Sequence, residues 1–199
     1  MDCEGNFVIL LKIWKTMGKI NAKEGMEVLK EGNARFVSGE LSQKANNSEL
    51  REQLGSGQQP FAVVLCCSDS RVAPEIIFDQ RLGDLFVIRN AGNVVDKLVL
   101  GSIEYAVEHL GSPLVVVLGH SSCGAVTATC QGGEQQGQIA AIVRRIRQSV
   151  GEAGSIDDNA RSHAKRMARL IGMNPVVRHE KVRVVAAFYD IRSGVVEWM

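Results

Sequence analysis

The chain alternates short apolar runs with longer stretches in which apolar residues recur every three or four positions. The apolar runs lie at residues 61–67, 84–89, 114–118 and 182–189. Runs of this length, bounded by Gly, Pro or polar residues, are typical of buried strands. The run 114–118 contains only Leu and Val, as in a parallel strand covered on both faces. Residues 195–198, after the turn at Gly194, predict an antiparallel edge strand.

Helical periodicity occupies much of the remaining chain. It covers residues 6–36, 99–110, 138–150 and 159–171, a segment starting near residue 125, and a short piece near 49–54 within the polar region 37–60. In the first segment Gly32 is the weak point of a repeat formed by Met26, Leu29, Lys30, Asn33 and Phe36. Strands that alternate with helices predict an α/β fold. We expect a mostly parallel sheet, with about four parallel strands plus an edge strand, flanked by helices and preceded by an N-terminal helical arm.

The length of the chain predicts one globular domain, and its balanced charge predicts that it binds neither nucleic acid nor a membrane. The 199 residues suit a single domain, and we divide them into an N-terminal extension at 1–21, expected to be helical, and a domain at 22–199. Lys plus Arg total 23 and Asp plus Glu total 22, which gives no general attraction to nucleic acid or an anionic membrane. The basic cluster Arg144, Arg145 and Arg147 is interpreted as a solvated helix face. The apolar run 7–11 is too short to span a membrane.

The cysteine pattern favours a reducing compartment. There are five cysteines, an odd number, and two of them are adjacent. This does not match the paired framework of a small secreted protein. We therefore expect a cytoplasmic protein whose thiols bind metal or take part in chemistry.

Chemically active side chains follow two of the predicted strands. Cys67, Asp69 and Arg71 end the first, and His120 and Cys123 follow the third. Because the carboxyl ends of parallel strands share one edge of the sheet, these side chains are expected to converge. Two thiolates and an imidazole suit Zn²⁺, and three protein ligands leave the fourth position open, as in catalytic zinc sites. The start of a helix near Cys123 favours its thiolate.

A simpler interpretation of each residue alone stays open. A single cysteine at a strand end is more often a buried apolar residue than a ligand, and a single histidine after Gly is more often a loop residue. By that standard six side chains are expected to be structural or at the surface: Cys3, Cys66, Cys130, His109, His163 and His179. Cys66 should point to the opposite face of the sheet from Cys67, because strand side chains alternate.

Asp69 and Arg71 are two positions apart and can pair. The pair is either an ordinary salt bridge or a gate, in which Asp69 fills the fourth zinc position when free and leaves it to water when held by Arg71. Zinc acidifies a bound water to hydroxide near neutral pH. Two thiolates reduce the effective charge of the zinc, so activity is expected to rise toward alkaline pH.

The segments 67–71 and 120–124 resemble the two signatures of the β-class carbonic anhydrases, in the plant-like branch. Segments 31–36, 89–93 and 102–106 are also similar to that family, and the likeness runs from about residue 22 onward. It implies a zinc lyase that hydrates CO₂ reversibly to bicarbonate and a proton through zinc-bound hydroxide. Zinc would be held by Cys67, His120 and Cys123, with Asp69 as a fourth ligand in a closed form. A homodimer at least, and tetramers as a larger form, are implied as well.

The resemblance assigns substrate contacts to four more positions. Gln58 matches a glutamine that hydrogen-bonds substrate, and the backbone N–H of Gly124 matches a bicarbonate contact. Phe86 and Tyr105 match the lining of the CO₂ cleft, although core packing alone would also explain them. An apolar slot with few donors suits a small apolar substrate and a small anion.

Other functions remain open from the sequence. The same fold and site could hydrolyse CS₂ or COS. A non-catalytic binding module stabilised by zinc would have Asp69 permanently in the fourth position, and the presence of Arg71 argues against it. A thiol redox role for Cys66 and Cys67 ranks last, because adjacent cysteines form a strained disulfide and no Cys-x-x-Cys occurs.

Overall fold

A five-stranded sheet forms the centre of the computed structural model, which describes residues 20–42, 46–133, 135–151 and 154–199. The strand order is β2-β1-β3-β4-β5. The first four strands are parallel, and β5 runs antiparallel to β4, so the predicted mostly parallel sheet with an edge strand is confirmed. The strands are β1 Ala62–Cys67, β2 Leu85–Asn90, β3 Leu114–His120, β4 Arg183–Tyr189 and β5 Val196–Trp198.

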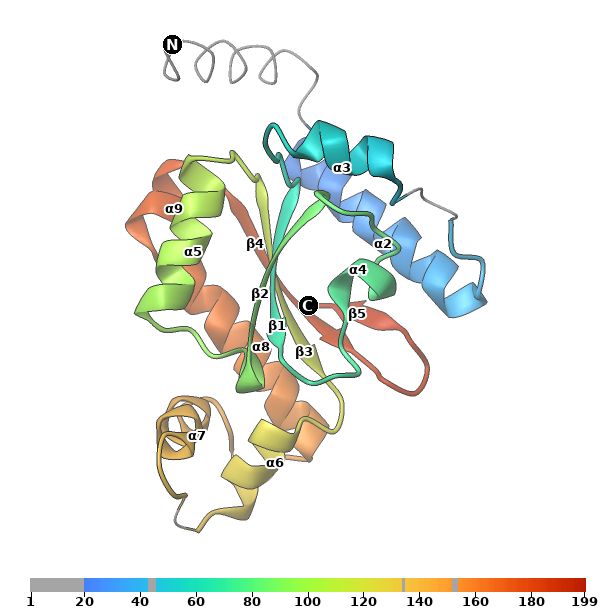
Figure 1. The fold of residues 1–199 in the computed structure, drawn as a ribbon. Helices are drawn as coiled ribbons and strands as arrows, with labels where there is room; N and C mark the ends of the chain where they lie inside the picture. Colours follow the sequence, from blue (N-terminus) through green and yellow to red (C-terminus); the bar gives the residue numbers. More distant parts are fainter. Residues whose placement is uncertain (1–19, 43–45, 134, 152–153) are drawn as a thin grey trace.

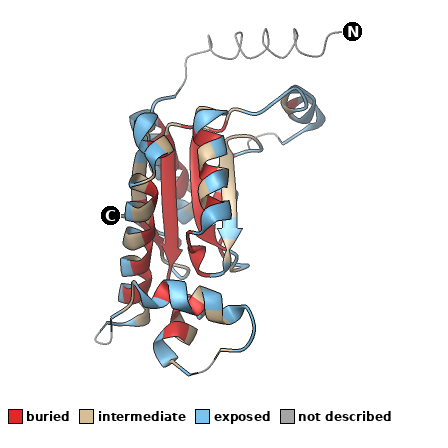
Figure 2. Cartoon of the chain, turned by 90° about the vertical axis from the view of Figure 1, so that its left-hand side faces the viewer, coloured by how far each residue is buried: buried red, intermediate tan, exposed pale blue. Residues whose placement is uncertain are grey.

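Helices cover both faces of the sheet (Figure 1). Helix α2 Ala22–Ser38 and the short α4 Pro74–Ile77 pack on one face, where Met26, Leu29 and Ile77 join the even-numbered residues of β1 and β3. Helices α5 Lys97–Glu108, α8 Ile156–Gly172 and α9 Pro175–His179 cover the other. Every residue of β1 and β3 is buried, which Figure 2 shows as a solid red layer between helices with exposed outer sides. Burial on both faces explains their continuous apolar runs.

Helix α2 packs on the sheet of its own domain. It begins at Asn21 with a capping box and ends at Gly39 in the left-handed conformation. Gly32, predicted as a weak point, marks a close approach, because a Cβ there would lie 1.8 Å from the carbonyl oxygen of Phe78. Within the three- and four-residue repeat, Lys30 is exposed and pairs with Glu27 at the helix surface. The prediction for residues 1–19 lies outside the described residues.

Two helices lie beyond the carboxyl ends of the strands. Helix α6 Gly124–Gln131 and helix α7 Ile139–Arg147 form a third apolar cluster with α8, through Val126, Ile146 and Ala160. The basic side chains of α7 are exposed, as predicted. Helix α3 Ser48–Leu54 matches the short helix expected in the polar region. Among the described residues, no helix combines the length and apolarity needed to cross a membrane.

Candidate metal centre

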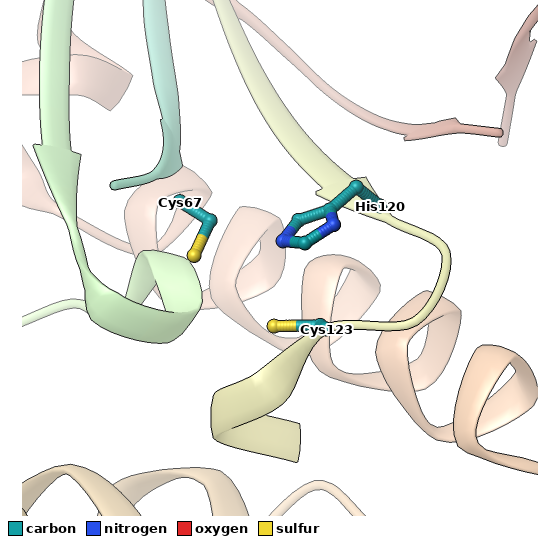
Figure 3. A group of neighbouring side chains, drawn as sticks. All are labelled: Cys67, His120 and Cys123. Carbon is teal, nitrogen blue, oxygen red and sulfur yellow. The ribbon is translucent and has the colours of Figure 1, made fainter. Parts of the chain in front are cut away.

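Three side chains that could ligate a metal meet at the carboxyl edge of the sheet. Cys67 is the last residue of β1, His120 is the last of β3, and Cys123 precedes the first turn of α6. Their ligand atoms all lie within 4.8 Å of one another, and all three residues are buried. Figure 3 shows the two sulfurs and the imidazole turned toward one another. The convergence expected from strands β1 and β3, which are neighbours, is confirmed.

The imidazole of His120 presents an unpartnered nitrogen to this group. Its Nδ1 lies 3.0 Å from the carbonyl oxygen of Ser121. A carbonyl only accepts, so Nδ1 carries the hydrogen and Nε2 keeps a free lone pair. Nε2 is buried and forms no hydrogen bond within the described chain. A buried nitrogen without a partner is costly, and a metal ion coordinated by Nε2 and two sulfurs would remove that cost. The donor set fits Zn²⁺.

The two thiols are poised to lose protons to a metal. The pKa of Cys67 is lowered, chiefly by a hydrogen bond from Cys123 and also by backbone N–H groups such as that of Gly92, against the effect of burial. The pKa of Cys123 is raised, because its proton is hydrogen-bonded to the Cys67 sulfur and because it is buried. The pair therefore holds one proton between two sulfurs, and a divalent cation would displace it.

Cys66 does not belong to this site. It is fully buried in the apolar cluster on the opposite face of the sheet from Cys67, as the alternation of strand side chains predicts. Burial raises the pKa of its thiol to about 12. A neutral thiol in an apolar environment behaves as a small hydrophobic side chain.

Backbone turns from β2 and its 3₁₀ extension η1 Ala91–Asn93 support the Cys67 side of the site. The N–H of Gly92 donates to the Cys67 sulfur at 3.3 Å. Gly92 has φ 74°, and a Cβ there would lie 2.6 Å from Ile146 Cδ1, so only glycine fits this turn. The guanidinium of Arg89 donates to the carbonyl oxygens of Cys67 and Asp69, at 3.2 Å and 2.8 Å.

The loop that carries His120 and Cys123 is fixed from two sides. Ser122 has φ 53°, and its N–H donates to the Asp157 carboxylate of α8 at 2.8 Å. The Ser121 hydroxyl oxygen accepts from the N–H of Ile191 at 2.9 Å. A non-glycine residue in the left-handed region needs such support from its surroundings.

Asp69 and Arg71 form a bidentate pair beside the metal group. Arg71 Nε donates to Oδ1 at 2.9 Å and Nη2 donates to Oδ2 at 2.7 Å. The backbone N–H of Arg71 adds a third bond at 3.0 Å. The side-chain hydrogen bonds from Arg71 are the main reason that the pKa of Asp69 lies well below its usual range. Asp69 lies outside the three-residue ligand group, and its role as a gate stays a prediction.

The four expected substrate contacts are not gathered around this group. Gly124 is next to it, as the first residue of α6, where a backbone N–H has no partner within the helix. Phe86 and Tyr105 pair with each other, with ring centroids 6.3 Å apart. Phe86 is level with Val63, four residues before the end of β2, hence about 13 Å along the sheet from the level of Cys67. Gln58 is exposed before the amino end of β1. Their substrate roles stay predictions.

Sequence reasoning missed three supports of the site: the N–H of Gly92, the carboxylate of Asp157 and the ring of His163. Gly92 lies in the segment 89–93, so its motif offered a signal. Asp157 and His163 carry no local signal, because the loops they contact are distant in sequence. His163 is 1% exposed and bonds the carbonyl oxygen of Gly92 at 2.8 Å.

Comparison with known proteins finds one family. A model described as carbonic anhydrase matches residues 62–196. Carbonic anhydrase 2 of Mycobacterium tuberculosis is 40% identical over 192 residues, which cover 89% of this chain and 93% of that protein. A carbonic anhydrase of Mycolicibacterium smegmatis is 51% identical over 138 residues, 67% of each chain.

Solved structures show the same fold. A tetrameric β-carbonic anhydrase from the filamentous ascomycete Sordaria macrospora superposes with a TM-score of 0.72 and 26% identity, covering 77% of this chain and 87% of that one. A β-carbonic anhydrase of Aspergillus fumigatus gives a TM-score of 0.68 and 27% identity, covering 76% and 80%. The shared fold therefore extends over about three quarters of this chain.

Proposed function

The chain belongs to the β-class carbonic anhydrase family, and from that premise we propose how its own residues perform the reaction. The reaction is the reversible hydration of CO₂ to bicarbonate and a proton, and the cofactor is zinc. The observation that carries the proposal is the convergence of three buried ligand atoms within 4.8 Å, next to a carboxylate held away by an arginine.

Cys67, His120 and Cys123 would hold the zinc ion through two sulfurs and Nε2. Zinc in such a site acidifies water, so that a nucleophile for CO₂ is available near neutral pH. The turns around Gly92 and Ser122 hold these three side chains in position. Burial of all three ligands excludes bulk water and strengthens each electrostatic contact.

The Asp69–Arg71 pair would keep the reacting position open and orient the reacting water. Held by Arg71, Asp69 does not compete for the metal. Its low pKa keeps it ionised, so it acts only as a hydrogen-bond acceptor for water. The N–H of Gly124, at the positive end of α6, is suited to donate to the bicarbonate anion that forms.

A second copy of the chain would complete the substrate cleft. Gln58 lies before the amino end of β1 and Cys67 is at its carboxyl end, and the five residue steps of the strand alone span about 17 Å. Within one chain Gln58 therefore cannot reach a substrate at the metal. We propose that Gln58, Phe86 and Tyr105 of one protomer line the cleft that serves the metal of its partner.

The exposed face around β2 supports a homodimer. β2 is an edge strand, and its residues from Leu85 to Ile88 are only half-buried in one chain. On the neighbouring helix α5, Leu98 is 81% exposed and Tyr105 is 48% exposed. A cluster of apolar side chains along a sheet edge is typical of an interface. The tetrameric relatives from Sordaria macrospora favour a larger assembly of such dimers.

We propose the cytoplasm as the compartment. All four cysteines among the described residues are free thiols. A site that depends on two thiolates keeps its ligands only where thiols stay reduced.

The test is stopped-flow CO₂ hydration between about pH 6.5 and about pH 9, on protein whose zinc content is measured. We expect one zinc per chain and a rate that rises with pH, because two thiolates weaken the acidifying effect of the ion. A zinc-loaded protein that hydrates no CO₂ at any pH would contradict the proposal. Turnover of CS₂ or COS by that protein would then assign the hydrolase function instead.

A further inference from the structure

His163 is a buried polar residue that lies behind the metal centre. It belongs to α8 and is 1% exposed, and it follows Ala160 of the apolar cluster at the carboxyl edge and precedes Ala164 of the cluster on the sheet face. Its Nε2 lies 2.8 Å from the carbonyl oxygen of Gly92, and its Nδ1 lies 3.0 Å from the hydroxyl of Ser149. Both ring nitrogens are therefore satisfied without any contact to a metal ligand.

The partners determine the tautomer of the ring. A carbonyl oxygen only accepts, so Nε2 carries the hydrogen and donates it to Gly92. Nδ1 then accepts from the hydroxyl of Ser149. Burial lowers the pKa of His163 to about 4, so the ring stays neutral with this arrangement at physiological pH.

Gly92 links His163 to the metal group. The peptide groups on its two sides point in different directions: its carbonyl accepts from His163, and its N–H donates to the sulfur of Cys67 at 3.3 Å. Gly92 also has the left-handed angles φ 74° and ψ 20°. The hydrogen bond from His163 holds the carbonyl of Gly92 and so restricts rotation about ψ. The direction of the Gly92 N–H relative to that carbonyl is then restricted as well.

We propose that His163 is a positioning residue of the metal centre: through the carbonyl of Gly92 it holds the turn whose N–H donates to the Cys67 sulfur. Outer hydrogen bonds of this kind orient ligands and affect metal affinity. The inference rests on the proposed zinc site but adds a residue that touches neither metal nor substrate. An apolar residue of similar size would fill the same space and leave Gly92 unheld.

The experiment measures retention of zinc rather than CO₂ hydration. Zinc-loaded wild type, His163→Leu and His163→Gln are mixed with a chromogenic chelator, and the rate of zinc transfer is followed. We expect His163→Leu to lose zinc at least about tenfold faster than wild type. Gln can donate an amide hydrogen from a position near Nε2, so His163→Gln should stay within about threefold of wild type.

Ile171→Ala is the matched control for general destabilisation. Ile171 is fully buried on the same helix, two turns further along, and the substitution removes core packing without touching Gly92. It should lower Tm and leave the zinc transfer rate unchanged. If His163→Leu does not fold, His163→Asn takes its place, because its shorter amide cannot reach Gly92, and the same acceleration is expected.

Three outcomes would overturn the inference. The first is zinc loss from the Leu or Asn variant at the wild-type rate. The second is equally fast loss from His163→Gln, which would make the donor to Gly92 irrelevant. The third is equally fast loss from Ile171→Ala. A wild-type protein that binds no zinc would overturn the proposed function as well, so the two failures are distinguishable.

Discussion

At the scale of single residues, we expect the Asp69–Arg71 pair to control what reaches the reacting position. Arg71→Ala removes both side-chain hydrogen bonds that hold the carboxylate. A freed Asp69 can ligate the metal, so we expect kcat/KM for CO₂ hydration to fall about 100-fold while zinc stays bound. Stopped-flow rates per zinc would measure this.

A second arginine–aspartate pair provides the control for that substitution. Arg81 pairs with Asp84 at 3.2 Å, with side-chain exposures of 51% and 18% against 49% and 16% for Arg71 and Asp69. Arg81→Ala should leave hydration unchanged, because an exposed ion pair away from the metal contributes little. Equal rates for the two zinc-loaded variants would exclude a role for Arg71 as a gate.

His163 also makes stability depend on pH. Its pKa is about 4 in the folded chain against 6.5 for an ordinary histidine, because burial disfavours the charged ring. Between these values the unfolded chain takes up a proton that the folded chain does not, so stability falls as pH falls from about 6.5 to about 4. Over this whole pH range the free energy of unfolding falls by about 3 kcal/mol because of His163. Urea unfolding of wild type and His163→Gln should show a shallower acid slope for the variant; parallel curves would contradict this.

At the scale of elements, helix α2 depends on a glycine that allows it to approach the loop after α4. A Cβ at Gly32 would lie 1.8 Å from the carbonyl oxygen of Phe78 and 2.7 Å from its carbonyl carbon. Gly32→Ala must therefore displace the helix, with an expected loss of about 3 kcal/mol in the free energy of unfolding. Gly172→Ala in α8, where a Cβ meets nothing within 4 Å, should be neutral or stabilising. Urea denaturation compares them, and similar values for both would contradict the close approach.

Helix α8 holds the loop that carries His120 and Cys123, and it also holds the turn at Gly92 that supports Cys67. Asp157 accepts from the N–H of Ser122, and His163 donates to the carbonyl of Gly92. Asp157→Ala releases a left-handed residue between His120 and Cys123, so we expect hydration per zinc to fall several-fold. Asp158→Ala removes the carboxylate that accepts hydrogen bonds from the N–H and the hydroxyl of Ser155, and it should lower Tm without that loss. If the two variants hydrate CO₂ equally well, the contact to Ser122 does not position the site.

At the scale of the whole molecule, activity is expected to depend on a second copy. Leu98→Asp places a charge on the exposed side of α5 beside β2, so it should shift the mass in solution from at least twice toward once the 21.6 kDa of one chain. Hydration should fall with it, because the cleft loses the partner's residues. Sedimentation velocity measures the mass, and Ile139→Asp, at a residue of α7 that is 56% exposed, is the control. A Leu98→Asp protein that keeps the wild-type mass would exclude this face as the interface.

The sequence by itself determined the strands, their parallel arrangement and the convergence of the three candidate metal ligands. An apolar run such as 114–118 indicates a strand from the local sequence alone, because a strand without polar residues is stable only when both of its faces are buried. The positions of Cys67 and His120 at strand ends then imply that they meet, since parallel strands share a carboxyl edge. Pairing of Asp69 with Arg71 also follows from a spacing of two residues.

Only the tertiary structure decided which distant groups support that site. The contact of His163 with Gly92 joins residues 71 positions apart, and that of Asp157 with Ser122 joins residues 35 apart. No local pattern encodes such contacts, because they depend on how α8 lies across the sheet. The same holds for Gly32. The sequence pattern shows only that glycine weakens the helix, whereas the packing shows that no larger residue fits against Phe78 at this position. The spacing of residues along the chain determines the helices and strands and the side chains at the strand ends. The packing of distant segments determines which backbone groups hold those side chains in place.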